Sequence, residues 1–357
     1  MSESSPQNAT PLVSVIVRSM NRPSLAATLA SIAAQDAAPV EVVVVAACGP
    51  GHPALPERCG PHALRLVQSA TPLSRPAAAN AGLDAAAGDW ITFLDDDDAM
   101  LEGHLRGLVA ARARAPSAEV IHCRARGVFA DGSMQRFGNP LSLLQLYERN
   151  YLHLSAVLFA RSLVARGCRF DLSLPMHEDW DFFIQLAQHT TFHFIPDDTV
   201  QWNVEAGTSG GGGGINQNDA EFARCRDLVY ARWSAQHDAL FERVEPILRD
   251  AATRAQRGDL PGAAQRCADA LAVSGNDPWA LNLLASVQRM QGRGEEARRS
   301  QELAVALRPF DPVMIYNLAL LYRAQGDIER TRLCCDRALV LDPEFDPAKK
   351  LRAAVAA

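Results

Sequence analysis

Short apolar runs alternate with amphipathic segments along the first 205 residues. Five runs rich in Val, Ile and Leu have the length of buried strands: residues 13–17, 40–45, 64–68, 90–94 and 120–123. Three segments between them space apolar residues as a helix does: 24–34, 77–87 and 101–115. This alternation predicts an α/β fold, with an open, mostly parallel sheet and helices on both faces. In such sheets, ligands bind beyond the carboxyl ends of the strands.

The chain beyond residue 216 has no strand pattern and contains an internal repeat. Gly258, Gly292 and Gly326 are 34 residues apart, and an alanine follows each glycine after twelve residues. Asp-Pro pairs recur at 277–278 and 311–312, and again at 342–343 with a slightly different offset. A period of 34 residues predicts one helix hairpin per repeat, with glycine at the turn and the small alanine allowing close packing. The pattern resembles the tetratricopeptide repeat family, in three units.

The change of pattern divides the chain into three parts. We expect an α/β domain at residues 10–215, a connecting helix at 216–245 and an all-α repeat domain at 246–357. Five consecutive glycines, residues 210–214, lie near the first boundary. They fit either a flexible linker or a mobile lid over a ligand.

Charge and composition narrow the class of partner. The chain has 35 Lys and Arg against 41 Asp and Glu, a net charge of −6, which argues against nucleic acid as the main ligand. No run of about 18 apolar residues and no basic, then apolar leader occurs, so we expect neither a transmembrane segment nor a secretory signal. The eight cysteines form no Cys-x-x-Cys pair and fit a reduced compartment, so we expect a cytoplasmic protein.

Four adjacent carboxylates are the clearest chemical signal. Asp95, Asp96, Asp97 and Asp98 directly follow the strand predicted at 90–94. Like charges this close repel one another unless a cation neutralises them, and hard oxygen ligands suit Mg²⁺ or Mn²⁺. The alternative is a solvated acidic turn that caps the next helix.

Three segments together give a specific resemblance. Residues 13–23, 79–83 and 87–98 resemble the family 2 glycosyltransferases, which have the nucleotide-diphospho-sugar (GT-A) fold, and the resemblance extends over residues 10–210. It implies that Asp95 and Asp97 form an Asp-x-Asp motif that holds Mn²⁺ or Mg²⁺ on a UDP- or GDP-sugar, with Asp98 beside them as a further ligand. It also implies a set of residues that contact the nucleotide sugar: Arg18, Asn21, Arg75, Asn80, Asp95 and Asp96.

A second acidic pair, Glu178 and Asp179, resembles the segment where this family opens a helix near the acceptor. The resemblance implies that Asp179 is the catalytic base, with Glu178 beside it in the catalytic site. A carboxylate is chemically suited to removing the proton of an acceptor hydroxyl. The alternative is that both acids only complement the positive end of a helix.

Three departures from the family pattern concern the donor. Ala46 and Ala47 follow the second strand, where relatives have acids that contact the base. Ala79 replaces a frequent arginine, and Arg75 is a possible substitute. Glu205 stands where relatives often have a histidine that binds the metal or the diphosphate, so Glu205 is a predicted metal ligand.

The resemblance implies a metal-dependent, inverting glycosyltransferase that moves a sugar from a nucleotide sugar to a hydroxyl of a glycan or protein. The repeats would recruit the acceptor or a protein partner, or only cover the catalytic domain. The alternative is a degenerate glycosyltransferase that acts as a repeat-mediated protein-binding scaffold. A nucleotidyltransferase is disfavoured, because the loop after the first strand lacks the glycines of a phosphate loop.

Overall fold

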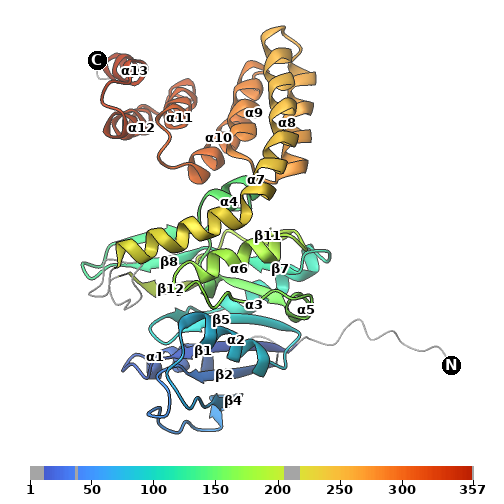
Figure 1. The fold of residues 1–357 in the computed structure, drawn as a ribbon. Coiled ribbons are helices and arrows are strands. Elements are labelled where there is room, and N and C mark those ends of the chain that lie inside the picture. Colours follow the sequence, from blue (N-terminus) through green and yellow to red (C-terminus); the bar gives the residue numbers. More distant parts are fainter. Residues whose placement is uncertain (1–11, 37–38, 205–217, 356–357) are drawn as a thin grey trace, which may run out of the picture. The chain divides into compact units, whose positions relative to one another are not determined.

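The computed structural model describes residues 12–36, 39–204 and 218–355, which form two compact units (Figure 1). The first unit consists of the chain up to Pro140 together with Arg149–Arg232. The second consists of Leu141–Glu148 and the chain from Trp233 onward. A short segment from the middle of the α/β sequence therefore belongs to the helical unit.

The first unit is built on an eight-stranded sheet with the order β11-β7-β10-β5-β1-β2-β4-β3. Its strands are β1 (Val13–Ser19), β2 (Val40–Ala46), β3 (Arg58–Cys59), β4 (His62–Val67), β5 (Trp90–Asp95), β7 (Val120–His122), β10 (Val157–Ala160) and β11 (Phe192–Phe194). The central pairs β5–β1, β1–β2 and β2–β4 are parallel, as the alternation predicted, and so is β7–β11. Strand β10 runs antiparallel to both of its neighbours.

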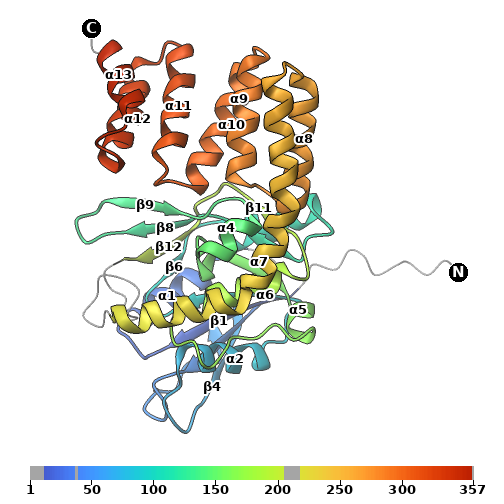
Figure 2. The same cartoon turned by 45° about the horizontal axis from the view of Figure 1, so that its top comes forward.

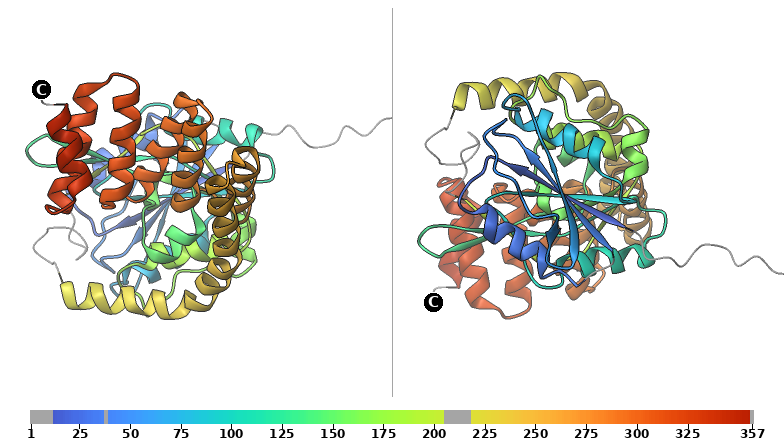
Figure 3. Two further views of the ribbon diagram at one scale, coloured as in Figure 1. Left: turned by 90° about the horizontal axis from the view of Figure 1, so that it is seen from above. Right: turned by 90° about the horizontal axis from the view of Figure 1, so that it is seen from below.

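Helices cover both faces of this sheet, and β1 is buried on both sides along its whole length. Val13, Val15 and Val17 belong to the same core cluster as Leu25 and Ile32 of α1 (Leu25–Ala33). Ile16 faces the other way, and Gly82 of α2 (Arg75–Ala85) comes so close that a Cβ there would lie 2.3 Å from Cγ2 of Ile16. Figure 3 shows α1 and α2 on opposite sides of the central strands. The predicted fold class is confirmed.

Smaller elements complete the first unit. A second sheet has the order β6-β12-β8-β9, and its strands are β6 (Ala99–Met100), β12 (Val200–Asn203), β8 (Ala125–Val128) and β9 (Met134–Phe137). The remaining helices are α3 (His104–Ala111), η1 (Arg112–Arg114), η2 (Leu154–Ala156), α5 (Arg161–Ala165) and α6 (Glu178–Ala187). The carboxyl end of β5 and the start of α6 carry the acids that the sequence singled out, and the carboxyl end of β1 carries Arg18.

The second unit consists of successive helix hairpins. Its helices are α4 (Leu143–Glu148), α8 (Leu260–Ser274), α9 (Pro278–Met290), α10 (Gly294–Leu307), α11 (Pro312–Ala324), α12 (Ile328–Leu341) and α13 (Asp346–Ala354), together with the end of α7 (Asp219–Gln256). Helices α9 and α10 lie side by side, as do α11 and α12 (Figure 2). Of the connecting helix expected at 216–245, residues 219–245 lie in α7, which continues through Pro246 to Gln256; residues 216 and 217 fall outside the described residues.

The periodic residues explain the hairpins. Gly258, Gly292 and Gly326 have φ angles of 84°, 77° and 79°, a left-handed backbone that glycine adopts without strain. Ala270, Ala304 and Ala338 are fully buried, where a larger side chain would push the paired helices apart. Aspartates cap the following helices; the Asp277 and Asp311 carboxylates accept hydrogen bonds from the backbone N–H groups of Ala280 and Met314.

Two expectations drawn from composition can be compared with the structure. Within the described ranges, no helix is both long enough and apolar enough to cross a bilayer. All eight cysteines are free thiols, and six of them are buried.

Candidate active site

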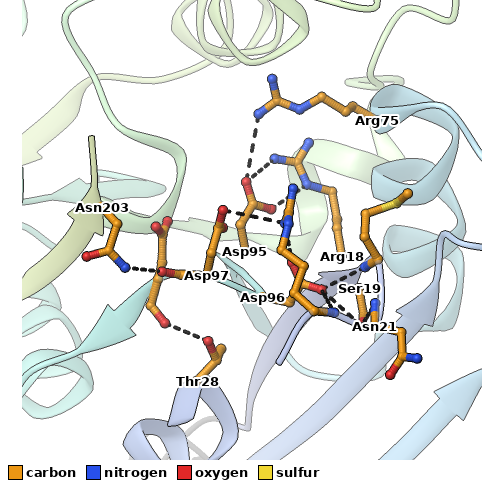
Figure 4. A network of polar contacts seen from close by, with 12 residues as sticks. Arg18, Ser19, Asn21, Thr28, Arg75, Asp95, Asp96, Asp97 and Asn203 are labelled. Atoms are coloured by element: carbon orange, nitrogen blue, oxygen red, sulfur yellow. Dashed lines mark hydrogen bonds and ion pairs between the residues drawn. The ribbon is translucent and has the colours of Figure 1, made fainter. Parts of the chain in front are cut away.

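Arg18 and Asp95 are direct partners on neighbouring parallel strands, at the carboxyl ends of β1 and β5. Nε and Nη2 of Arg18 donate to Oδ1 and Oδ2 of Asp95 at 2.8 and 2.7 Å (Figure 4). Burial alone would raise the pKa of Asp95, but the charge and hydrogen bonds of Arg18 outweigh it and hold that pKa below the ordinary value. Asp95 is therefore an oriented, ionised carboxylate.

The Asp96 side chain accepts hydrogen bonds from the loop that follows β1. This side chain is fully buried, and Oδ2 accepts the backbone N–H of Met20 at 2.7 Å. Arg22 also donates to this carboxylate, and so does the hydroxyl of Ser19, at 3.2 Å. The Ser19 hydroxyl lies 2.9 Å from Nε2 of His52 as well. Asp96 thus holds the loop that carries Arg22.

Asp97 is less tightly paired than Asp95 and Asp96. Nη1 of Arg22 lies 3.5 Å from its Oδ2. Burial, then the charges of Asp95 and Asp96, raise the pKa of Asp97 against the opposing effect of Arg22. Its backbone carbonyl accepts a hydrogen bond from Asn203 at 2.8 Å, which ties β12 to this turn.

Asp98 is buried deeper and has a different partner. The Ser155 hydroxyl donates to its carboxylate at 3.1 Å, and the Thr28 hydroxyl donates to its backbone carbonyl at 2.8 Å. Burial and the neighbouring charges of Asp95 and Asp97 raise the pKa of Asp98 well above its ordinary value. Asp98 does not line the pocket at this edge.

A pocket of about 290 Å³ opens at the strand ends beside Asp95 and Asp97. It combines three arginines with apolar side chains, and its lining residues are Arg18, Met20, Arg22, Ala47, Leu73, Ser74, Arg75, Ala78, Asp95 and Asp97. Arg75 is the first residue of α2, so the positive end of that helix also faces the pocket. Cationic groups around a cavity of this size favour an anionic ligand.

Glu178 joins this corner to helix α6. Its carboxylate is buried, and Oε1 lies 3.0 Å from Nη1 of Arg18 and 3.3 Å from Nε of Arg75. Arg75 also lies 3.8 Å from Asp95 (Figure 4). Two arginines and two acids from four different elements therefore form one charge network, and Glu178 serves as its anchor on α6.

Asp179, the next residue, faces a second pocket of about 460 Å³. This pocket is lined by Arg75, Phe137, Arg149, Asn150, Met176, His177, Glu178, Asp179, Trp180, Phe222, Arg226 and Tyr230. Burial and the charge of Glu178 raise the pKa of Asp179 to about 6, against the opposing charge of Arg75. A carboxylate with such a pKa is suited to proton transfer near neutral pH.

The other predicted site residues lie elsewhere. Asn80 uses its side-chain amide on the peptide of Phe170, donating to the carbonyl at 2.8 Å and accepting from the N–H at 3.0 Å. Asn21 has a left-handed φ of 58°, and its backbone N–H donates to Ser19. Neither lines the pocket beside Asp95. Glu205 and the glycines at 210–214 fall outside the described residues.

Two residues that the sequence reading did not single out stand close to the predicted ones. Asn150 donates from Nδ2 to Oδ2 of Asp179 at 3.1 Å. The His153 ring stacks on Trp202 with 4.9 Å between ring centroids. Burial lowers the pKa of His153 to about 4, although the charge of Asp95 opposes this shift. Both residues lie in a stretch of chain without a recognisable motif, so only the folded structure reveals them.

The oxygen donors at the edge of β5 suit a hard divalent cation. Among the residues that the structure describes, no three acidic, histidine or cysteine side chains gather as a complete metal site. Mg²⁺ is commonly held by one or two carboxylates together with the phosphates of its ligand, and Asp95 and Asp97 line one pocket. A cation there would also relieve the repulsion that raises the pKa of Asp97. The residues present fit such an ion.

Comparisons with known proteins agree with this geometry. Residues 14–171 match the family model described as glycosyl transferase family 2. The uncharacterized glycosyltransferase YwdF of Bacillus subtilis is 26% identical over 202 residues, which are 52% of this chain and 71% of that protein. The succinoglycan biosynthesis protein ExoO of Rhizobium meliloti is 29% identical over 188 residues, 48% of this chain and 54% of that protein.

Among solved structures, residues 1–349 of TarS from S. aureus in complex with UDP-GlcNAc align with a TM-score of 0.47 and 17% identity, over 90% of each chain. On the family match and the curated relatives, residues 14–171 form a domain similar to family 2 glycosyltransferases, and helix hairpins with a 34-residue period follow it.

Proposed function

We propose that the protein transfers a sugar from a nucleotide diphosphate sugar to a hydroxyl group, with inversion at the anomeric carbon. One observation carries this proposal. Arg75 lines both the pocket that contains Asp95 and Asp97 and the pocket that contains Asp179. A donor diphosphate in the first pocket and an acceptor hydroxyl in the second would meet beside this arginine.

The first pocket is assigned to the donor. Arg18, Arg22 and Arg75 would face the diphosphate, and Asp97 and Asp95 would hold Mg²⁺ or Mn²⁺. When bound, the ion neutralises charge that develops on the departing diphosphate. The apolar side chains left for the nucleoside are Met20, Ala47, Leu73 and Ala78. The departure at Ala46 and Ala47 therefore removes an acidic contact with the base and does not remove the pocket.

The second pocket is assigned to the acceptor. The Asp179 carboxylate takes the proton of the acceptor hydroxyl while its oxygen bonds to the anomeric carbon and the bond to the diphosphate oxygen breaks. A retaining mechanism by double displacement needs a second carboxylate as nucleophile. Glu178 is buried and paired with Arg18 and Arg75, so it is not available for that role. This supports a single displacement and hence inversion.

For the acceptor we propose a growing glycan. The relative from Rhizobium meliloti is described as a succinoglycan biosynthesis protein, and it covers about half of this chain. The aromatic residues Phe137, Trp180, Phe222 and Tyr230 line the acceptor pocket and offer apolar faces on which a sugar ring can lie. We assign recruitment of an acceptor or protein partner to the repeats, and a cytoplasmic location to the protein, whose thiols are free.

The test is turnover by the purified full chain with a panel of nucleotide sugars, Mn²⁺ and glycan acceptors. Asp179→Asn is expected to lower kcat by about 10²–10⁴-fold while binding of the nucleoside diphosphate persists. Asp84→Asn, an exposed aspartate on α2, is the matched control and should keep full turnover. Wild-type turnover in Asp179→Asn would refute the base. Retained anomeric configuration would refute inversion, and absence of nucleotide binding would favour a degenerate scaffold.

A further inference from the structure

Helix α4 lies in the sequence of the α/β domain but packs in the repeat unit. The backbone N–H and the side-chain amide of Asn276 both donate to the Leu141 carbonyl, at 3.1 and 3.0 Å. Ser142 forms a β-bridge with Gly275, and a Cβ on Gly275 would lie 2.8 Å from the same carbonyl oxygen. The turn between α8 and α9 is thus shaped to receive this segment.

The rest of α4 is fixed by burial and by an ion pair. Leu144, Leu146 and Tyr147 of this six-residue helix are buried. At its end, Oε2 of Glu148 lies 3.4 Å from Nη1 of Arg308, at the end of α10. The Arg308 guanidinium in turn lies over the ring of Trp279, 5.2 Å from its centroid. The repeat unit therefore fixes both ends of the segment Leu141–Glu148.

Asn150 follows two residues after this anchored helix and lies in the first unit. Its Nδ2 donates to Oδ2 of Asp179 at 3.1 Å, and its Oδ1 accepts the backbone N–H of Leu152 at 3.0 Å. The amide orientation is thereby determined, because the acceptor oxygen is already used by the local turn. The other oxygen of Asp179 accepts the N–H of Trp180 at 2.8 Å.

We propose that Asn150 is a positioning residue for Asp179, and that the anchorage of α4 in the repeat unit determines where Asn150 stands. This inference rests on the proposed role of Asp179 as base. It gives the repeats a second task beside recruitment: they hold a segment whose continuation orients the base. A partner that binds the repeats and disturbs the turn at Gly275 would then change catalysis through the chain itself.

The physical effect of Asn150 follows from its donor. A hydrogen bond to the ionised form of a carboxylate favours that form, so its loss raises the carboxylate's pKa further. The charged and titratable groups around Asp179 are Glu178 and His177 at the start of α6, Arg18 and Arg75 beside the donor pocket, and Arg149 and Arg226 around the acceptor pocket. None of these groups is altered when Asn150 is replaced.

The first test replaces the amide. Asn150→Asp keeps the oxygen that caps Leu152 but removes the donor and adds a negative charge; Asn150→Ala removes both contacts. In the pH profile of kcat/KM, both variants should shift the fall on the acidic side to higher pH. The shift should be about one pH unit for Asn150→Ala and larger for Asn150→Asp. Titration of the Asp179 carboxyl by ¹³C NMR, in aspartate-labelled protein, should show the same shifts without any turnover.

The second test acts from the repeat side with a matched pair of arginines. Arg308→Ala removes one of the partners of Glu148. Arg330→Ala removes an arginine of α12 that likewise lies over an aromatic ring, Tyr322, and faces an aspartate, Asp327. We expect Arg308→Ala to raise the pKa of Asp179 in the same direction as Asn150→Ala, and Arg330→Ala to leave it unchanged.

The outcomes are separable. An unchanged Asp179 titration in both Asn150 variants overturns the positioning role. If the pKa of Asp179 shifts in the Asn150 variants but is the same in Arg308→Ala and Arg330→Ala, the anchorage by the repeats is overturned. If the titrations shift as expected while the wild-type protein transfers no sugar, the inference about Asn150 stands and the proposed function fails.

Discussion

Nη1 of Arg18 lies 3.0 Å from Oε1 of Glu178, and these two residues are separated by 160 positions in the chain. The contact joins the end of β1, where the proposed donor pocket begins, to the first turn of α6, where the proposed base stands. Arg18 also donates two hydrogen bonds to the Asp95 carboxylate, so one guanidinium connects both acidic motifs. The network orders the site before any ligand binds.

The first prediction concerns pH. The pKa of Asp179 is raised to about 6, and only its ionised form accepts a proton. The value of kcat/KM should therefore fall about tenfold for each pH unit below about 6 and be flat just above it. A pH-rate profile from pH 4.5 to 8 measures this. A flat profile across pH 5–7 would contradict the assignment.

The raised pKa of Asp179 also affects stability. As pH rises, it should increase activity but lower stability. A carboxyl whose folded pKa lies above its ordinary 3.8 binds its proton more tightly in the folded state. Its contribution to the free energy of unfolding therefore declines as pH rises from about 4 to about 6. Urea unfolding at these pH values should show a decline in the wild type that Asp179→Asn lacks. Parallel curves for the two proteins would be the contrary result.

The second prediction distinguishes two adjacent aspartates. Asp97→Asn should abolish the Mn²⁺-dependent part of the rise in melting temperature that a nucleoside diphosphate causes. Ligand at a hundred times its Kd stabilises a protein by about 2.7 kcal/mol, so the loss is measurable. The unliganded melting temperature should stay near that of the wild type, because the ion pair of Asp97 with Arg22 is long, at 3.5 Å, and Arg22 keeps its contact with Asp96. A full Mn²⁺ effect in Asp97→Asn would refute its role.

Asp96→Ala should show the reverse pattern. It removes the buried carboxylate that accepts the N–H of Met20, and a hydrogen bond to a charged group contributes about 1.5–3 kcal/mol. Arg22 loses one of its two carboxylate partners as well. Thermal unfolding should therefore report a clear destabilisation. The exposed Asp89, in the turn before β5, is the matched control, and Asp89→Ala should stay within about 0.5 kcal/mol. An unchanged melting temperature in Asp96→Ala would contradict this account.

A further prediction concerns Asn80. Both hydrogen-bonding ends of its amide are used by the peptide of Phe170. Asn80→Ala should lower the free energy of unfolding by about 1–3 kcal/mol and leave nucleotide affinity nearly unchanged in the folded protein. Gln265→Ala, an exposed amide on α8, serves as control. A large loss of nucleotide affinity at unchanged stability would instead support the nucleotide contact that the family resemblance implies.

The acidic edge of the sheet could be predicted because it depends on local pattern. An apolar run that ends in aspartates, in a chain of alternating strands and helices, places those acids at the carboxyl end of a buried strand. The repeats were predictable for the same reason, since glycine, alanine and Asp-Pro recur at one interval. Both predictions depend only on the order and spacing of residues along the chain.

The contacts that complete the site could not be predicted in this way. The four aspartates are equivalent in sequence, and only the fold assigns Asp96 to the loop after β1 and Asp97 to the pocket. The sequence shows Glu178 only as the neighbour of Asp179. The two arginines that form ion pairs with Glu178 come from β1 and α2. Residues 141–148 carry no signal that they belong to the repeat unit, because Asn276, which donates to the Leu141 carbonyl, lies 135 residues further along.

The position of α4 has a practical consequence for anyone who wishes to divide the molecule. A fragment ending at Arg232 would keep Leu144, Leu146 and Tyr147 but discard the unit to which their helix belongs, including His237, whose ring lies edge-on to Tyr147. These side chains would then face water together and make the shortened enzyme prone to aggregation. The converse fragment, starting at Trp233, would expose the surface that α4 covers, so the two halves are best expressed as one polypeptide.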